Sequence, residues 1–242
     1  HFALLNDNRT VQPFEWGTEF VVEGIEPRPQ AANGANGHET GTQNIDPREA
    51  LAEFSKNAIA NSDEYFAAPD ISDFQLENRV YPSAASLSAE ELKTPPKQIE
   101  IPVLKWTSAI ETVSKENNTA YATYFPAASA VSGGGRGKIR VPRAVIILPH
   151  WNAKAGTYFD LAKFLNKVGL SALRLTLPYH EERMPPELER ADHLVSPNIG
   201  RSLQSIRQAV LDTRAAIAWL KRQGYEKVSI VGTSIGSCVA FM

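Results

Sequence analysis

The hydrophobic positions in the second half of the chain alternate between short apolar runs and longer stripes at helical spacing. Apolar runs over 143–149, 171–177 and 228–231, the last of them β-branched, predict buried strands. Between them, apolar residues recur every three or four positions over 158–168 and 199–220, which predicts two helices. Strands that alternate with helices predict a parallel sheet with helices on both faces.

An antiparallel pair is predicted just upstream of these strands. Residues 99–110 and 118–125 are rich in β-forming residues, and the polar stretch 111–117 fits a turn between them. The expected fold class is therefore α/β, with an antiparallel hairpin followed by parallel strands.

The first 97 residues predict an irregular, partly helical extension. Residues 28–45 are polar and rich in Gly and Asn, as in a linker. Asp46 then precedes a proline and, three positions on, a glutamate, which is a typical helix start; the helix is expected to reach about Asn61. We expect 1–97 to wrap on a domain formed by 98–242.

The last predicted strand ends in Gly-Thr-Ser-Ile-Gly, which fits the pattern G-x-S-x-G centred on Ser234. A serine hydroxyl needs a position outside the sheet, near a base and near N–H donors, to become a useful nucleophile. A tight strand-to-helix turn gives that position, and it requires glycine at 232 and 236 because a Cβ there would strike its neighbours. The N–H of Ile235, at the helix start, is the expected oxyanion donor.

On this motif and the order of strands and helices before it, the chain resembles the α/β-hydrolase superfamily over about residues 98–242. The sheet would be an incomplete version of the superfamily's sheet. The resemblance implies an esterase-like or lipase-like serine hydrolase that cleaves a small-molecule carboxylic ester through an acyl-enzyme at Ser234. It implies no cofactor and no metal.

The resemblance also implies that the loop after the first parallel strand supplies a second oxyanion N–H. In the family this loop often contains His-Gly-x. Here His150 matches the His, Trp151 stands in place of the Gly, and Asn152 takes the donor position. Asn152 is preferred by position, and Trp151 is the alternative. His150 is expected to brace the loop.

The loop after the next strand contains Tyr179 and His180, followed by two glutamates. Together with His150, these side chains are expected to form a polar rim of the substrate cleft. A metal site is not favoured, because the cluster lacks helical His spacing and a second group of ligands. Residues 184–198 are long enough to form a small lid.

The acid and base of a catalytic triad are missing from the expected positions. In the superfamily both follow the serine, whereas every histidine of this chain precedes Ser234. The chain is therefore expected to be an N-terminal fragment that ends just after the elbow helix and is inactive by itself. The alternative is a naturally shortened, non-catalytic α/β module that binds a ligand or partner protein.

Composition narrows the possible partners. The net charge of −2 over 242 residues gives no reason to expect binding to nucleic acid, and no apolar run approaches the roughly 18 residues of a membrane span. The single cysteine, Cys238, excludes an internal disulfide, which favours a reducing compartment such as the cytoplasm. Cys238 is expected to be buried in the helix after the elbow. The oligomeric state is left open.

Overall fold

A computed structural model of the chain describes residues 13–21, 46–82, 98–127 and 141–242. The linker expected over 28–45 lies outside the described residues.

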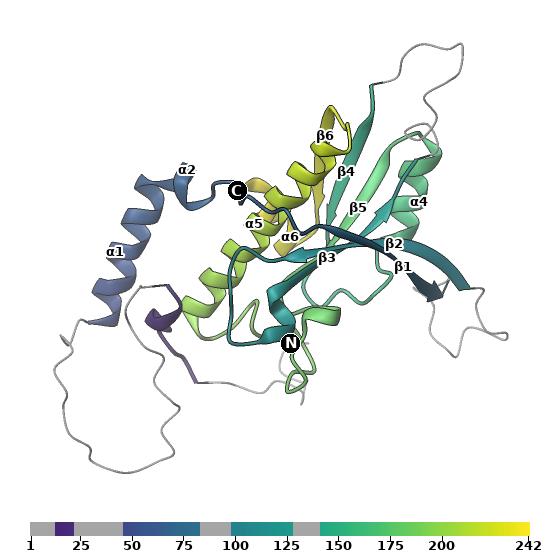
Figure 1. Ribbon diagram of the computed structural model, residues 1–242. Coiled ribbons are helices and arrows are strands. Elements are labelled where there is room, and N and C mark those ends of the chain that lie inside the picture. The colour runs from purple at the N-terminus through teal and green to yellow at the C-terminus, as the bar shows by residue number, and fades with distance from the viewer. Residues whose placement is uncertain (1–12, 22–45, 83–97, 128–140) are drawn as a thin grey trace, which may run out of the picture.

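The described residues form a sheet of six strands in the order β1-β2-β3-β5-β4-β6 (Figure 1). The strands are β1 (Gln75–Pro82), β2 (Gln98–Thr107), β3 (Thr119–Phe125), β4 (Arg143–Leu148), β5 (Ser171–Thr176) and β6 (Lys227–Gly232). β1, β2 and β3 are antiparallel neighbours, β3 is antiparallel to β5, and β4 runs parallel to both β5 and β6. The expected α/β fold, with an antiparallel hairpin followed by parallel strands, is confirmed.

The strand β1 was not predicted from the sequence. It pairs with β2 along its whole length, from Gln75 opposite Lys105 to Pro82 opposite Gln98. Half of its residues are polar, and its apolar residues Leu76 and Val80 are more than half exposed. An edge strand with little to bury leaves no hydrophobic alternation to detect. The sheet therefore begins inside the segment that the sequence assigned to the extension.

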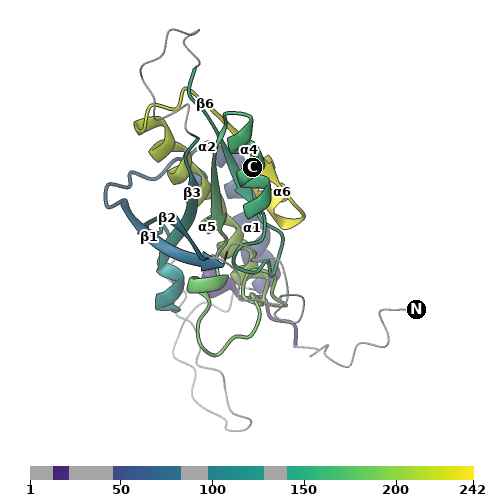
Figure 2. The ribbon, with the colours of Figure 1, turned by 90° about the vertical axis from the view of Figure 1, so that its right-hand side faces the viewer.

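Helices cover both faces of the sheet. The longer ones after the hairpin are α4 (Phe159–Lys167), α5 (Ile199–Arg222) and α6 (Ile235–Phe241). Alternate residues of β4 enter two separate cores: Ile146 and Leu148 pack with α5 and α6, whereas Val145 and Ile147 pack with α4. In both ribbon views α4 and α5 lie on opposite sides of β4 and β5 (Figure 2).

The predicted helix near the N-terminus is α1 (Pro47–Ala60), followed by α2 (Ser62–Tyr65). The Asp46 side chain accepts a hydrogen bond from the Arg48 N–H at 2.9 Å, so the expected cap is present. α1 packs against the short 3-10 helix η2 (Thr18–Phe20), and Leu51 is the buried residue of α1. Two further 3-10 helices, η3 (Lys115–Asn118) and η4 (Glu181–Arg183), lie close together next to the site described below.

Candidate functional site

Ser234 sits in the predicted turn between β6 and α6. Its backbone has φ 53° and ψ −122°, a conformation that a residue with a side chain adopts at a cost of about 1–3 kcal/mol. A Cβ on Gly236 would lie 2.6 Å from the carbonyl oxygen of Pro149 and closer still to that of Leu148. A Cβ on Gly232 would overlap the backbone of Gly236. Both glycines are therefore required by the close approach of α6 to the strand ends.

Among the described residues other than glycine, positive φ angles occur only at one end of the sheet. Five non-glycine residues have positive φ, and all five follow the carboxyl end of a parallel strand. They are Asn152 and Tyr158 after β4, Tyr179 and Glu181 after β5, and Ser234 after β6. Strained backbone clusters at functional sites because only surrounding structure can hold it there. This edge is also where open α/β sheets bind ligands.

The side chain of Ser234 is accessible at the protein surface. The residue is exposed, and its Oγ makes no hydrogen bond to another described residue. The N–H of Ile235, the first residue of α6, is likewise unbonded within the described residues, as expected for a helix N-terminus. One serine oxygen and one N–H donor thus stand at the same turn.

Cys238 is exposed, so the expectation that it is buried was wrong. α6 buries Gly236 and Val239 against the sheet. Cys238 points away from these two residues, because a helix that buries one stripe leaves the opposite side outside the core.

The loop after β4 begins in contact with the elbow, because the Thr233 N–H donates to the Leu148 carbonyl at 3.1 Å. The Asn152 N–H, the preferred oxyanion donor, instead donates to His180 Nε2 at 2.8 Å. That preference does not fit the geometry, since this N–H already has an acceptor. The N–H of Trp151, the alternative donor, makes no hydrogen bond to another described residue.

Side chains of the same loop are anchored to the segment 184–198. Trp151 Nε1 donates to the carbonyl of Ala191 at 2.9 Å, and Asn152 Oδ1 accepts from the N–H of Ala191 at 2.8 Å. The Arg190 guanidinium lies over the Trp151 ring, 4.7 Å from its centroid. Trp151 and Asn152 therefore have a fixed position relative to the segment expected to be a lid.

His150 Nδ1 and the hydroxyl of Tyr158 form a hydrogen bond at 2.7 Å. This contact joins the start of the loop to its end, because Tyr158 immediately precedes α4. The arrangement is that of a residue that braces the loop.

His180 is buried, with 2% of its surface exposed. Its Nδ1 lies 2.9 Å from the carbonyl of Pro178, which can only accept, so the ring proton is on Nδ1 and Nε2 is the acceptor for Asn152. Burial, together with the charges of the nearby Arg174 and Arg183, lowers the pKa of His180 to about 4. His180 is therefore neutral at pH 7.

Tyr179 does not lie on a cleft rim as expected. Its side chain is 2% exposed and its ring meets that of His193 edge-on, with centroids 5.1 Å apart. The loop turns it inward because Tyr179 has φ 61° and its N–H donates to Asn117 Oδ1 at 3.0 Å.

A groove of about 710 Å³ borders the loops after β4 and β5. Its lining combines charged and small side chains: Asn152, Ala153, Lys154, Ala155, His180, Glu181, Glu182, Met184, Glu189 and Arg190. Two of its carboxylates are already paired, Glu181 with Arg174 and Glu182 with Arg79, each at 2.6 Å.

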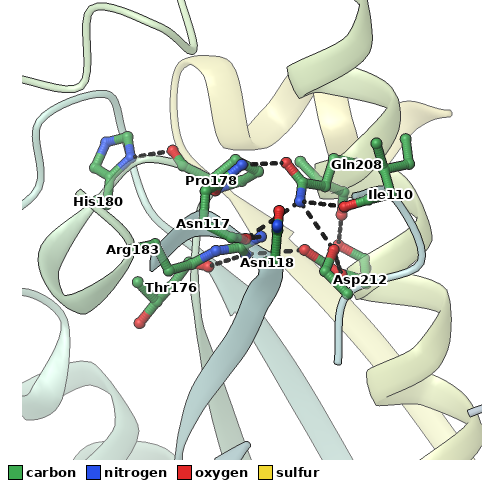
Figure 3. Close-up of polar contacts among 12 residues, drawn as sticks. Ile110, Asn117, Asn118, Thr176, Pro178, His180, Arg183, Gln208 and Asp212 are labelled. Carbon is green, nitrogen blue, oxygen red and sulfur yellow. Dashed lines mark hydrogen bonds and ion pairs between the residues drawn. The ribbon is translucent and has the colours of Figure 1, made fainter. Parts of the chain in front are cut away.

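A buried polar network lies beneath the loop after β5 (Figure 3). Arg183 donates to Asp212 of α5 at 2.8 Å, to the Thr176 carbonyl at 3.1 Å and to the Asn117 carbonyl at 2.9 Å. Gln208 of α5 accepts from Asn117 Nδ2 at 2.8 Å. The network ties both ends of the loop that carries His180 to α5 and η3.

This network was not predicted from the sequence. The apolar pattern gave no signal for it, because Asp212 lies on the side of the helix opposite the apolar stripe of residues 199, 203, 206, 210, 217 and 220, and the fold nevertheless buries it. Burial raises the pKa of Asp212, and the charge of Arg183 opposes that rise. A charge at that position required a buried cation as partner.

Within the described ranges, no three His, Cys, Asp or Glu residues gather in a way that could hold a metal ion. The helices described there include none that is long and apolar enough to cross a membrane.

Comparison with known proteins gives few matches. No family model and no curated protein matches the chain. Among solved structures, TT1662 from Thermus thermophilus is 18% identical with a TM-score of 0.35, over 54% of this chain and 48% of that one. An acetyl xylan esterase from Paenibacillus sp. R4 is 14% identical with a TM-score of 0.43, over 78% of this chain and 52% of that one. The chain thus spans about half the length of these two proteins.

Proposed function

We propose that this chain carries the nucleophile of a serine hydrolase that cleaves carboxylic esters. The observation that carries the proposal is the conformation of Ser234, held exposed at φ 53° between two glycines that cannot accept a side chain. A strained, exposed serine at the ligand-binding edge of an α/β sheet is what nucleophilic catalysis needs.

In the proposed reaction, Ser234 Oγ attacks the ester carbonyl carbon while a base takes its proton. The oxyanion that forms is bound by the N–H of Ile235 and by the N–H of Trp151. Collapse of the tetrahedral intermediate expels the alcohol, which takes up the proton, and leaves the acyl group on Ser234. Water then attacks the acyl-enzyme, which releases the carboxylic acid and restores the serine.

The proposal places the base and its carboxylate partner outside the described residues. No described histidine makes a hydrogen bond to Ser234. The buried His180 is committed through both ring nitrogens and His150 through Nδ1 to Tyr158. A serine without a base stays a protonated alcohol with little reactivity.

The substrate in this proposal is a small-molecule ester. The groove beside the loops after β4 and β5 has a volume of about 710 Å³, within the range of small-molecule sites. Ser234 is not among its lining residues, so in this proposal the groove holds a part of the substrate away from the ester carbonyl.

The test is labelling of the protein, expressed from its complete reading frame, with a fluorophosphonate probe that reacts with activated serines. We expect wild type and Ser55→Ala, a change in the distant helix α1, to label equally, and Ser234→Ala to remain unlabelled. Hydrolysis of p-nitrophenyl acetate should follow the same pattern. Equal labelling of the Ser234→Ala variant and wild type contradicts the proposal. A folded wild type that neither labels nor hydrolyses favours the alternative, a non-catalytic module that binds a ligand or partner.

A further inference from the structure

His180 is the only described side chain that hydrogen-bonds a backbone N–H of residues 150–152. It does so from a different loop, 28 residues further along the chain. Its tautomer is fixed, because Nδ1–H donates to the Pro178 carbonyl at 2.9 Å and leaves Nε2 as a pure acceptor. The ring therefore presents a lone pair to the Asn152 N–H.

The loop that carries His180 is held in place by the buried polar network. Arg183 binds the Thr176 carbonyl at one end of the loop, and the Tyr179 N–H is held by Asn117 in the middle. Both contacts belong to the network that includes Asp212 and Gln208 of α5 (Figure 3). Because α5 packs in the main core, the acceptor on His180 has the rigidity of the core rather than that of a surface loop.

The two candidate N–H donors of the loop, those of Trp151 and Asn152, differ in whether they already have an acceptor. Turning the peptide of Asn152 to free its N–H would break a partly buried hydrogen bond and leave Nε2 of the buried His180 without a donor, which costs free energy. The Trp151 N–H has no such partner among the described residues. Trp151 also follows a residue next to the elbow, since a Cβ on Gly236 would lie 2.6 Å from the carbonyl oxygen of Pro149, two residues before Trp151.

We propose that His180 is a positioning residue of the hydrolase site. By accepting the Asn152 N–H, it fixes the loop after β4 so that the Trp151 N–H is the second donor to the oxyanion. This inference rests on the proposed function, and it assigns to His180 a role that acts through the loop and not on the substrate.

The test compares three variants of His180 in the protein expressed from its complete reading frame. Gln places its Oε1 as many bonds from Cβ as Nε2 is in His, so His180→Gln retains an acceptor for Asn152. His180→Phe keeps a planar ring without an acceptor. His180→Asn is polar but one carbon too short, and it replaces the Phe variant if that variant fails to fold.

Two readouts separate the role in the loop from the role in catalysis. Amide hydrogen exchange measured by NMR should show a protected Asn152 N–H in wild type and His180→Gln, with exchange at least about tenfold faster in His180→Phe or His180→Asn. The kcat for ester hydrolysis should fall about 10²-fold in the variants without an acceptor, with KM changed less than about threefold, because a misplaced oxyanion donor acts on the transition state. His180→Gln should recover most of the kcat.

The outcomes distinguish this inference from the proposed function. If Ser234→Ala abolishes hydrolysis but His180→Phe retains wild-type kcat, the enzyme stands and the positioning role is wrong. An Asn152 amide that exchanges at the same rate in all variants also overturns the inference. If Ser234→Ala is as active as wild type, the proposed function fails, and the positioning role in catalysis fails with it.

Discussion

Arg183 and Asp212 form an ion pair at 2.8 Å in which both side chains are completely buried. The second oxygen of Asp212 accepts from the hydroxyl of Ser108 at 2.8 Å. Both carboxylate oxygens therefore have a donor, one just after β2 and one in η4. The Nε of Arg183 has no partner among the described residues. The pair therefore joins α5 to the loop of His180 at the cost of one unsatisfied donor.

Removal of Asp212 should be strongly destabilising. Asp212→Ala leaves the Arg183 charge buried without a counter-charge, and we expect a loss of about 3–5 kcal/mol in the free energy of unfolding measured with urea at 25 °C. Glu77→Ala, which breaks a partly exposed pair with Arg79 and Lys105, is the control and should cost about 1 kcal/mol or less. A loss below 1 kcal/mol for Asp212→Ala would show that the pair does not secure the fold.

A methyl group at position 236 should disrupt the elbow. In an ordinary helix Gly→Ala stabilises by about 0.5–1 kcal/mol. Gly236→Ala should instead destabilise by about 1–3 kcal/mol, because the new Cβ overlaps the Leu148 carbonyl and the core cannot yield without strain. Thermal unfolding of the variant is the measurement.

Gly224→Ala is a useful comparison for that variant. Gly224 has φ +88° but open space around its Cα, so the substitution costs only the backbone strain of about 1–2 kcal/mol. Gly224→Ala should leave fluorophosphonate labelling of Ser234 intact, whereas Gly236→Ala should reduce it. Equal labelling of both variants would argue against a steric role for Gly236.

Stability should fall as the solution is acidified below the ordinary pKa of histidine. Burial lowers the pKa of His180 from 6.5 to about 4, so between these values the unfolded chain binds a proton that the folded protein does not. The free energy of unfolding should therefore decrease as pH falls from about 6.5 to about 4, by up to roughly 3 kcal/mol for this residue, and level off below.

His180→Gln should remove that part of the pH dependence. The lowered pKa of His193 contributes a slope in the same direction, so the variant should retain some loss of stability on acidification. Urea unfolding at several pH values between 4.5 and 7 measures the difference. Parallel curves for wild type and His180→Gln would mean that His180 is not buried in its neutral form.

The sequence by itself determined the elements around the elbow. Apolar runs and helical stripes located β4, β5, β6, α4 and α5 to within a few residues, because their periodicity is set by which face each residue buries. The G-x-S-x-G pattern located the turn at Ser234, since the glycine requirement is local to the turn.

Only the tertiary structure decided the rest. β1 has no hydrophobic alternation, so its place in the sheet became visible through its pairing with β2. The exposure of Cys238 depends on which side of α6 meets the core. The Asn152 N–H donates to His180, and Asp212 forms an ion pair with Arg183; in each pair the two residues are far apart along the chain. Spacing along a sequence fixes what a residue's own element does, whereas a hydrogen-bond partner from another loop is chosen by how the folded elements pack.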